Sequence, residues 1–343
     1  MSRFRLSIVI IARNEEQTIT NAIGSAMMAA SQVENIKSYE IIFVDDSSTD
    51  KTVEKIIGFP ITVLQHEQQA GPSAARFSGY KYMSPDTDFV LFVDGDTTVC
   101  KNWLSAAIRY MLMKPKVAGV SGRFIRSYSE ETNSTNDMES CNNAILPEIL
   151  HGTPQLHLPG SASMYLKKVI DEVGPFCPWL RGGEEQELGF RIRQRDFELH
   201  RLNLFIALSH IKKSKESVFH RMQFSRGLGQ LFSAYRGTPL FRELIITYYG
   251  HFLVFGWVVF STPIAALSLV GLVQPILWKF IGIFSILGYL AAIKKKGGIL
   301  KATRTLIALF FESLGILSGL REHTDTTLPK VHLLKKSNQI QNK

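Results

Sequence analysis

The chain has 343 residues, of which 45% are hydrophobic, and a net charge of +9 at pH 7. This length can bury a large core and allows two domains, or one domain with an appendage. The positive charge is concentrated in residues 294–343, which hold ten Lys and Arg against three Asp and Glu. Because this basic segment follows long apolar stretches, we expect it to face an anionic membrane surface rather than nucleic acid.

The chain contains three cysteines, Cys100, Cys141 and Cys177. Their spacing does not match a metal site, and an odd number of cysteines cannot all pair. We therefore expect free thiols in a reducing compartment.

Short β-branched apolar runs alternate with helical segments over the first 122 residues. The predicted strands are residues 6–12, 39–44, 61–64, 88–93 and 117–122, and the predicted helices include residues 51–57 and 101–113. Strands that alternate with helices in this way indicate an α/β fold, with a mostly parallel sheet between two layers of helices.

Three of these strands end in polar or acidic residues: Asn14 with Glu15, Asp45 with Asp46, and Asp94 with Asp96. In a parallel sheet the carboxyl ends of the strands lie along one edge, where open α/β sheets bind their ligands. One acid there could be accidental. Acids at successive strand ends predict a site for a metal and a polyhydroxyl or nucleotide ligand.

The motif Asp94-Gly95-Asp96 comes directly after an apolar run. Two carboxylates one residue apart suit a hard divalent cation, whose other ligands would be water and substrate phosphates. An isolated motif of this kind is most often an acidic surface turn. The metal assignment therefore depends on the other strand ends.

Glutamates open a predicted helix that begins near residue 184, after two consecutive glycines. The helix dipole favours acids in a first turn, which explains some of them. Helix spacing pairs Glu187 with Arg191 and leaves Glu185 pointing elsewhere. Because paired glycines can form a hinge that presents a general base, Glu185 is our candidate base.

Residues 124–157 are polar with little periodicity, and they predict a binding segment or lid. Further along, His220 follows a basic stretch where the chain leaves the predicted sheet. A lone histidine is usually structural. The alternative is that His220 completes the coordination of a metal held by Asp96.

Six motifs follow one another along residues 5–235: Val9 to Glu15, Val44 to Asp50, Gly71 to Arg76, Asp94 to Asp96, Gly160 to Met164, and Gly183 to Leu188. Their order, more than any single motif, resembles that of family 2 glycosyltransferases with a GT-A fold. This resemblance implies an enzyme that takes a nucleoside diphosphate sugar as donor and inverts the anomeric carbon.

The resemblance also implies a role for each matching residue. Asp45 and Asp46 hold the base and ribose with Asn14 and Glu15 lining the same pocket, Arg76 and Asp94 lie at the diphosphate, Asp94 and Asp96 bind Mg or Mn, and Glu185 is the inverting base. Two positions depart from the family pattern: Ala12 and Arg13 precede Asn14 in place of a tyrosine or threonine, and Glu185 replaces an aspartate. An Arg-Trp pattern typical of processive synthases is missing near residues 223–232, which favours addition of a single sugar.

Two apolar stretches, residues 244–273 and 276–293, predict a transmembrane hairpin. Three lysines at 294–296 mark its cytoplasmic return. Residues 299–320 are apolar but contain three charged side chains, so they predict an interfacial or re-entrant helix, with a third span as the alternative.

We therefore expect a glycosyltransferase domain over residues 1–235, a transmembrane hairpin over 236–293, and a basic juxtamembrane segment with a helix and tail over 294–343. The expected function is sugar transfer to a membrane-associated, lipid-linked acceptor in glycan or polysaccharide synthesis. The protein would lie at the cell membrane with its catalytic domain facing the cytoplasm. Two alternatives stay open: a nucleotidyltransferase acting on a sugar phosphate, and a non-catalytic membrane scaffold that binds a nucleotide sugar.

Overall fold

The fold is seen in a computed structural model of the chain. The structure describes residues 3–127, 150–210, 218–269, 298–322, 328–337 and 340–341, with residues 285, 286, 288–290, 293, 294 and 296. The chain divides into two compact units. The sheet unit is Met1–Lys213 with Thr324–Lys343, and the helical unit is Ser214–His323.

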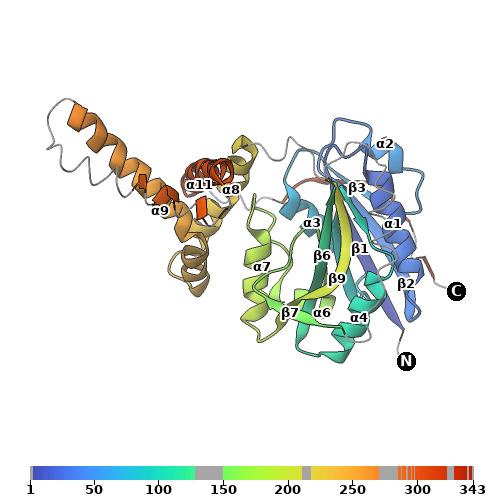
Figure 1. The fold of residues 1–343 in the computed structure, drawn as a ribbon. Coiled ribbons are helices and arrows are strands. Elements are labelled where there is room, and N and C mark those ends of the chain that lie inside the picture. Colours follow the sequence, from blue (N-terminus) through green and yellow to red (C-terminus); the bar gives the residue numbers. More distant parts are fainter. Residues whose placement is uncertain are drawn as a thin grey trace. The chain divides into compact units, whose positions relative to one another are not determined.

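The sheet unit alternates strands and helices (Figure 1). Its strands are β1 (Phe4–Ala12), β2 (Ile36–Asp45), β3 (Thr62–His66), β4 (Phe89–Asp94), β5 (Thr97–Val99), β6 (Val117–Ser127), β7 (Gly152–Gln155), β8 (Ala162–Leu166), β9 (Glu198–His210), β10 (Val331–Lys335) and β11 (Ile340–Gln341). Its helices are α1 (Ile19–Ser31), α2 (Thr52–Ile56), α3 (Pro72–Tyr82), α4 (Trp103–Met113), α6 (Lys167–Val173) and α7 (Glu184–Arg193). Each strand and helix predicted in the first 122 residues has a counterpart within a few residues of its expected bounds.

The sheet is mixed, with strand order β10-β3-β2-β1-β4-β8-β6-β9-β5. Strands β1 to β4 are parallel, whereas β8 runs antiparallel between β4 and β6. This finding corrects the expectation of a mostly parallel sheet. A strand buried on both faces has the same apolar pattern in either direction, so the sequence could not give the direction of β8.

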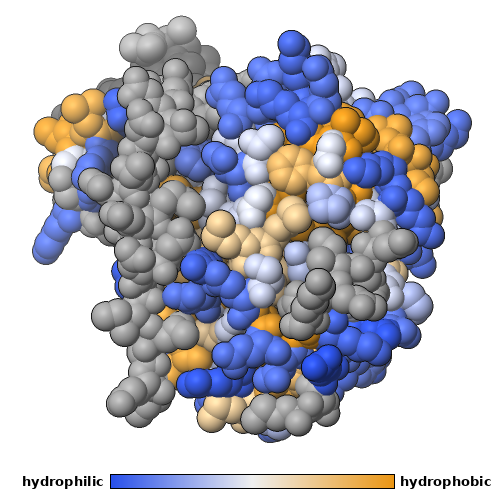
Figure 2. All heavy atoms as spheres, turned by 90° about the vertical axis from the view of Figure 1, so that its right-hand side faces the viewer, coloured by the Kyte–Doolittle hydropathy of each residue, from blue (hydrophilic) through white to orange (hydrophobic). Residues whose placement is uncertain are grey.

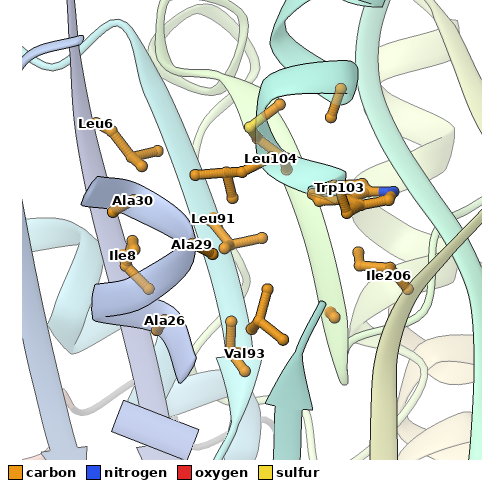
Figure 3. Packing of buried hydrophobic residues seen from close by; sticks show 14 of the residues in the cluster. Leu6, Ile8, Ala26, Ala29, Ala30, Leu91, Val93, Trp103, Leu104 and Ile206 are labelled. Carbon is orange, nitrogen blue, oxygen red and sulfur yellow. The ribbon is translucent and has the colours of Figure 1, made fainter. Parts of the chain in front are cut away.

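Two apolar layers lie on opposite faces of the sheet, because side chains alternate along each strand. On β1, Leu6, Ile8 and Ile10 pack in the cluster that includes α1 and α4, whereas Val9 and Ile11 pack in the cluster that includes α3 and α7. Figure 3 shows the first layer, in which Ala26, Ala29 and Ala30 of α1 lie over the sheet beside Leu104 and Trp103 of α4. Helices therefore cover both faces of the sheet. The edge at the carboxyl ends of the parallel strands is left as the place where a ligand can bind.

The last described residues return to the sheet unit and add two strands to it. β10 pairs antiparallel with β3, and β11 pairs antiparallel with the first part of β2. The Lys335 Nζ atom donates hydrogen bonds to the carbonyl oxygens of Ile57, at 2.7 Å, and Phe59. From the sequence we predicted only a basic tail here.

The helical unit contains α8 (Val218–Ala234), α9 (Pro239–Leu269) and α11 (Ile299–Gly319). α8 and α11 approach so closely that a Cβ added to Gly319 would lie 1.9 Å from the carbonyl oxygen of Arg226. All three helices meet at Glu312, whose carboxylate accepts a hydrogen bond from Arg221 Nε at 2.6 Å and lies 2.7 Å from His251 Nε2. Backbone contact and this polar group together fix how the helices pack.

Within the described residues, one segment is long and apolar enough to cross a membrane, Pro239–Ser261 of α9, with a mean hydropathy of 1.6. Only 6% of it is buried, and its outward side chains include Ile246 (72% exposed), Leu253 (65%) and Phe260 (73%). Residues 276–293, the second arm of the expected hairpin, lie largely outside the described residues. The described residues thus contain one candidate span, and the second arm of the hairpin stays a prediction.

Two further observations concern the sheet unit. Cys177 carries a free thiol whose pKa is raised by burial, whereas Cys100 is disulfide-bonded. The disulfide corrects the expectation of free thiols alone. On the face of the molecule in Figure 2, hydrophobic residues lie among hydrophilic ones, as is normal for a protein surface.

Candidate active site

The predicted polar strand ends lie next to one another at one edge of the sheet. Ala12, at the end of β1, pairs with Asp45 of β2, and Ile11 pairs with Asp94 of β4. Asp45 and Asp94 therefore lie at nearly the same level on the two strands that flank β1. The prediction that the acidic clusters share one edge is confirmed.

The turn after β1 is tied to the turn after β2. Asn14 adopts a left-handed backbone with φ of 56°, and its Oδ1 accepts a hydrogen bond from the Thr49 backbone N–H at 2.8 Å. The Asn14 N–H donates to Ser48 Oγ at 2.9 Å, and the Glu15 N–H donates to Thr52 Oγ1 at 2.8 Å. The two turns thus form one connected wall of the site.

Asp45 is fully buried at the end of β2. Its Oδ2 atom accepts hydrogen bonds from the Ser48 N–H at 2.9 Å and from Gln65 Nε2 at 3.0 Å. Its Oδ1 atom has no partner among the described residues. A buried carboxylate oxygen without a donor is costly.

Asp46 holds the loop between β3 and α3. Its carboxylate accepts hydrogen bonds from the backbone N–H groups of Ala70 (2.8 Å) and Gly71 (2.9 Å), and His66 Nδ1 lies 2.8 Å from it. Burial raises the pKa of Asp46, but these hydrogen bonds outweigh burial and lower the pKa overall. His66 in turn contacts Ser78 Oγ at 2.9 Å through Nε2, so Asp46 anchors a buried chain of polar groups.

Arg76 lies in α3 and is 2% exposed. Its Nη1 donates to Glu184 Oε1 and its Nη2 donates to Asp94 Oδ1, both at 2.8 Å. Burial lowers the pKa of Arg76, but the carboxylates of Asp94, Glu184 and Glu185 outweigh burial and raise it. The guanidinium therefore stays charged and joins the turn after β4 to the start of α7.

The glutamates at the start of α7 have three different environments. Glu187 is buried and forms a two-bond ion pair with Arg191, at 2.6 Å for each bond, as the helix spacing predicted. Glu184 is 1% exposed, and burial together with the charge of Glu185 raises its pKa, although the Arg76 guanidinium opposes this effect. Glu185 is partly exposed, and its Oε1 accepts a hydrogen bond from the Gly160 N–H at 3.2 Å. Of the three, Glu185 is the one placed to meet a substrate.

The turn after β4 presents Asp94 and Asp96. Gly95 is required between them, because a Cβ there would lie 2.6 Å from the Cβ of Ala12. The Asp96 carbonyl accepts a hydrogen bond from the His210 N–H at 2.9 Å, which fixes the end of β9 beside the turn. Burial lowers the pKa of His210, although the charges of Asp96 and Glu15 oppose this effect. His210 therefore lies close enough to both acids to interact with them.

The donor atoms at this turn fit a hard divalent cation. No group of three or more His, Cys, Asp or Glu placed to hold a metal occurs in the described part of the chain. Mg²⁺ usually takes only one or two protein carboxylates and completes its shell with water and phosphate oxygens. Asp94 and Asp96, with a phosphate-bearing ligand, match this requirement.

His220, our predicted third ligand, lies in α8 of the helical unit. Its side chain is outside the described part of the structure, so its predicted role stays a prediction. His210 is the histidine that the fold brings to Asp96. The sequence signal that could have identified His210 is its position at the end of a strand. We did not predict that strand, β9, from the sequence.

The comparisons with known proteins agree with this geometry. Residues 7–174 match the family described as Glycosyl transferase family 2. The matched segment contains the polar ends of β1, β2 and β4 together with Arg76. It ends before Glu184 and Glu185.

Among similar sequences, the pre-mycofactocin glycosyltransferase of Mycobacterium tuberculosis is 29% identical over 196 residues, which cover 54% of this chain and 38% of that protein. A UDP-Glc:alpha-D-GlcNAc-diphosphoundecaprenol beta-1,3-glucosyltransferase of Escherichia coli is 28% identical over 127 residues, covering 36% of this chain and 47% of that protein. The alignments thus span less than half the length of either relative.

Among solved structures, the mannosyltransferase PcManGT from Pyrobaculum calidifontis, in complex with GDP-Man and Mn2+, superposes with a TM-score of 0.57. The match covers 92% of this chain and 88% of that chain at 16% sequence identity, which shows a shared fold. Residues 7–174 thus match glycosyltransferase family 2, and the chain has a GT-A-like fold with a mixed sheet and flanking helices.

Proposed function

We propose that this protein transfers a single sugar from a nucleoside diphosphate sugar to a hydroxyl group of a lipid-linked acceptor, with inversion at the anomeric carbon. The observation that carries this proposal is the convergence of the Asp94 turn and the Glu184–Glu185 helix start on the buried Arg76 guanidinium. A candidate metal-binding carboxylate and a candidate base are thereby held in one site. The family match supports the donor class.

Each end of the site has a task in the proposed reaction. Asp45 and Asp46, at the end of β2, would border the base and ribose of the donor. Asp94 and Asp96, with His210 beside them, would hold Mg²⁺ or Mn²⁺. When bound, such a cation stabilises the negative charge on the departing diphosphate.

Glu185 would act as the general base. Its carboxylate takes the proton from the acceptor hydroxyl, the acceptor oxygen bonds to the anomeric carbon, and the bond from that carbon to the diphosphate breaks. The nucleoside diphosphate leaves with the electron pair. Attack from the side opposite the leaving group inverts the anomeric carbon.

The test is a transfer assay with a polyprenyl diphosphate-linked sugar as acceptor. The donor is first chosen as the nucleotide sugar that raises the melting temperature most in Mn²⁺. We expect release of a nucleoside diphosphate, and a loss of kcat of at least about 100-fold in Glu185→Gln and Asp96→Asn. The control Glu172→Gln alters an exposed ion pair and should stay within about twofold of the parent.

Other outcomes of this assay would contradict the proposal. Transfer at the parental rate by Glu185→Gln and Asp96→Asn would exclude the assigned roles. Release of pyrophosphate would identify a nucleotidyltransferase instead. Donor binding without transfer or hydrolysis over a broad acceptor panel would identify a binding scaffold.

We further propose that α9 attaches the protein to the cytoplasmic face of the cell membrane, where a lipid-linked acceptor would be found. Two observations support this attachment. α9 exposes large apolar side chains along one face, among them Ile246, Leu253 and Phe260. Residues 214–323 hold 12 Lys and Arg against 4 Asp and Glu, a net +8 of the chain's +9, which suits anionic headgroups.

Vesicle flotation tests this attachment. The parent should float with vesicles that contain about a third phosphatidylglycerol, and less with pure phosphatidylcholine at the same salt. Replacing Ile246, Leu253 and Phe260 together with glutamate should abolish flotation. The control replaces three exposed apolar residues of the sheet unit, Met28, Tyr82 and Leu112, with glutamate. Equal flotation of the two triple variants would contradict the role of α9.

A further inference from the structure

Arg76 stands out because its guanidinium is enclosed on several sides. The ring of Phe176 lies 5.5 Å from Cζ. On another side is Gly160, where an added Cβ would lie 2.5 Å from Arg76 Nη2 and 2.8 Å from Cζ. A side chain that is 2% exposed and confined in this way is held in one position.

The same glycine also borders the candidate base. A Cβ on Gly160 would lie 2.5 Å from Glu185 Oε1, and the Gly160 N–H donates to that oxygen at 3.2 Å. Arg76 and Glu185 therefore both border one backbone position, where a Cβ would displace their terminal atoms. The position of either side chain depends on the other through this contact.

The two terminal nitrogens of Arg76 are already used by protein carboxylates. Nη1 binds Glu184 and Nη2 binds Asp94, both at 2.8 Å, and both Arg76 and Glu184 have side chains no more than 3% exposed. The third nitrogen, Nε, has no partner among the described residues, but it is buried as well. The guanidinium thus presents no exposed edge to a diphosphate.

We propose that Arg76 is a positioning residue. It holds the metal-binding Asp94 and the base Glu185 in the correct positions relative to each other, and it does not bind the diphosphate. It acts on Asp94 directly, and on Glu185 through Glu184 and Gly160. The planar guanidinium donates to two carboxylates on different elements in a fixed geometry, whereas a lysine ammonium is a point charge on a flexible stem and does not fix both directions. This inference rests on the proposed transfer reaction.

Three variants test the proposal. Arg76→Lys keeps the charge but removes the planar guanidinium with its two terminal donor nitrogens. Gly160→Ala keeps every charged group but displaces Arg76 and Glu185. Arg76→Met with Glu184→Gln removes the buried cation and its buried partner together, which protects the fold if Arg76→Lys alone is unstable. The control is Gly24→Ala, because a Cβ at Gly24 meets nothing within 4 Å.

Each variant is measured for kcat and donor KM by the transfer assay, and for nucleoside diphosphate affinity by calorimetry. We expect kcat to fall at least 30-fold in all three variants, while donor KM and nucleotide affinity stay within about threefold and the control behaves as the parent. A loss of nucleotide affinity of more than tenfold in Arg76→Lys would make Arg76 a diphosphate ligand and overturn the proposal. Parental kcat in Arg76→Lys and Gly160→Ala would overturn it too.

The calorimetric arm separates this inference from the proposed function. If the parent transfers no sugar, the proposed function fails. Even then, an unchanged nucleotide affinity in Arg76→Lys supports the positioning role over the ligand role, and a lost affinity contradicts it.

Discussion

Two residues that follow β1 and β2 adopt a left-handed backbone conformation, which is unfavourable for residues other than glycine. Asn14 has φ of 56° and Ser47 has φ of 62°. Asparagine tolerates this left-handed region, but serine does so less readily. Both residues border the acids of the site, where backbone strain commonly accompanies function.

Replacing Ser47 with glycine should stabilise the protein. A left-handed L-residue costs roughly 1–2 kcal/mol, and the added flexibility of glycine in the unfolded chain offsets about half of that gain. We expect the free energy of unfolding of Ser47→Gly to rise by about 0.5–1 kcal/mol in urea titrations. Ser84→Gly, at a position without positive φ, should instead destabilise. A loss of stability in Ser47→Gly would show that the serine side chain contributes more than the strain costs.

The hydrogen bonds of Asp46 predict a pH dependence. Its folded-state pKa lies below the ordinary value of 3.8, so its contribution to stability is complete above about pH 5 and is lost as the pH falls through the folded pKa. Asp46→Asn should therefore unfold about 2 kcal/mol more easily than the parent at pH 7. That difference should shrink below about pH 4.

The control for Asp46 is Asp86→Asn, whose side chain is 65% exposed. Its effect on the free energy of unfolding should stay small at pH 7. A difference between Asp46→Asn and the parent that stays constant from pH 7 to pH 3 would contradict the assignment.

At the scale of elements, glycines decide which helices can touch. α8 and α11 meet through their backbones: Gly229, Gly315 and Gly319 each lie where a Cβ would come within about 2.1 Å of a carbonyl oxygen on the facing helix. No side-chain movement can relieve such a contact. The helices would have to separate, which also strains the bonds at Glu312.

Gly319→Ala should therefore destabilise the helical unit by about 1–3 kcal/mol. Thermal denaturation followed by circular dichroism in detergent, together with limited proteolysis between α9 and α11, measures this change. Gly256→Ala in α9, where a Cβ meets nothing within 4 Å, should be neutral or stabilise by about 0.5–1 kcal/mol. Equal melting curves for the two variants would show that the close approach is not needed.

At the scale of the whole molecule, the helical unit is an insertion in the sheet unit. The chain leaves the sheet unit after residue 213 and re-enters it at residue 324. β10 then covers the edge of β3, and the Glu67 N–H donates to the Lys330 carbonyl at 3.0 Å. The C-terminal residues thus complete the sheet that carries the site.

Lys335 tests whether this return stabilises the sheet unit. Its ammonium group caps the Ile57 and Phe59 carbonyls, so Lys335→Met should lower the free energy of unfolding by about 1–2 kcal/mol. Lys336→Met, at the exposed neighbouring position, is the matched control and should change it by less than about 0.5 kcal/mol. If both variants unfold alike, the C-terminal strands contribute little to stability.

The sequence by itself determined most elements of the first 122 residues, though not β5, and the shared edge of their acidic ends, because local periodicity and turn chemistry specify both. It also predicted the Glu187–Arg191 pair, since helix spacing alone brings those side chains together. Only the tertiary structure decided that β8 runs antiparallel, that His210 reaches Asp96, and that the C-terminus returns to β3. The bridge from Arg76 to Glu184 joins residues 108 positions apart. Such contacts depend on how elements pack, which no local pattern encodes.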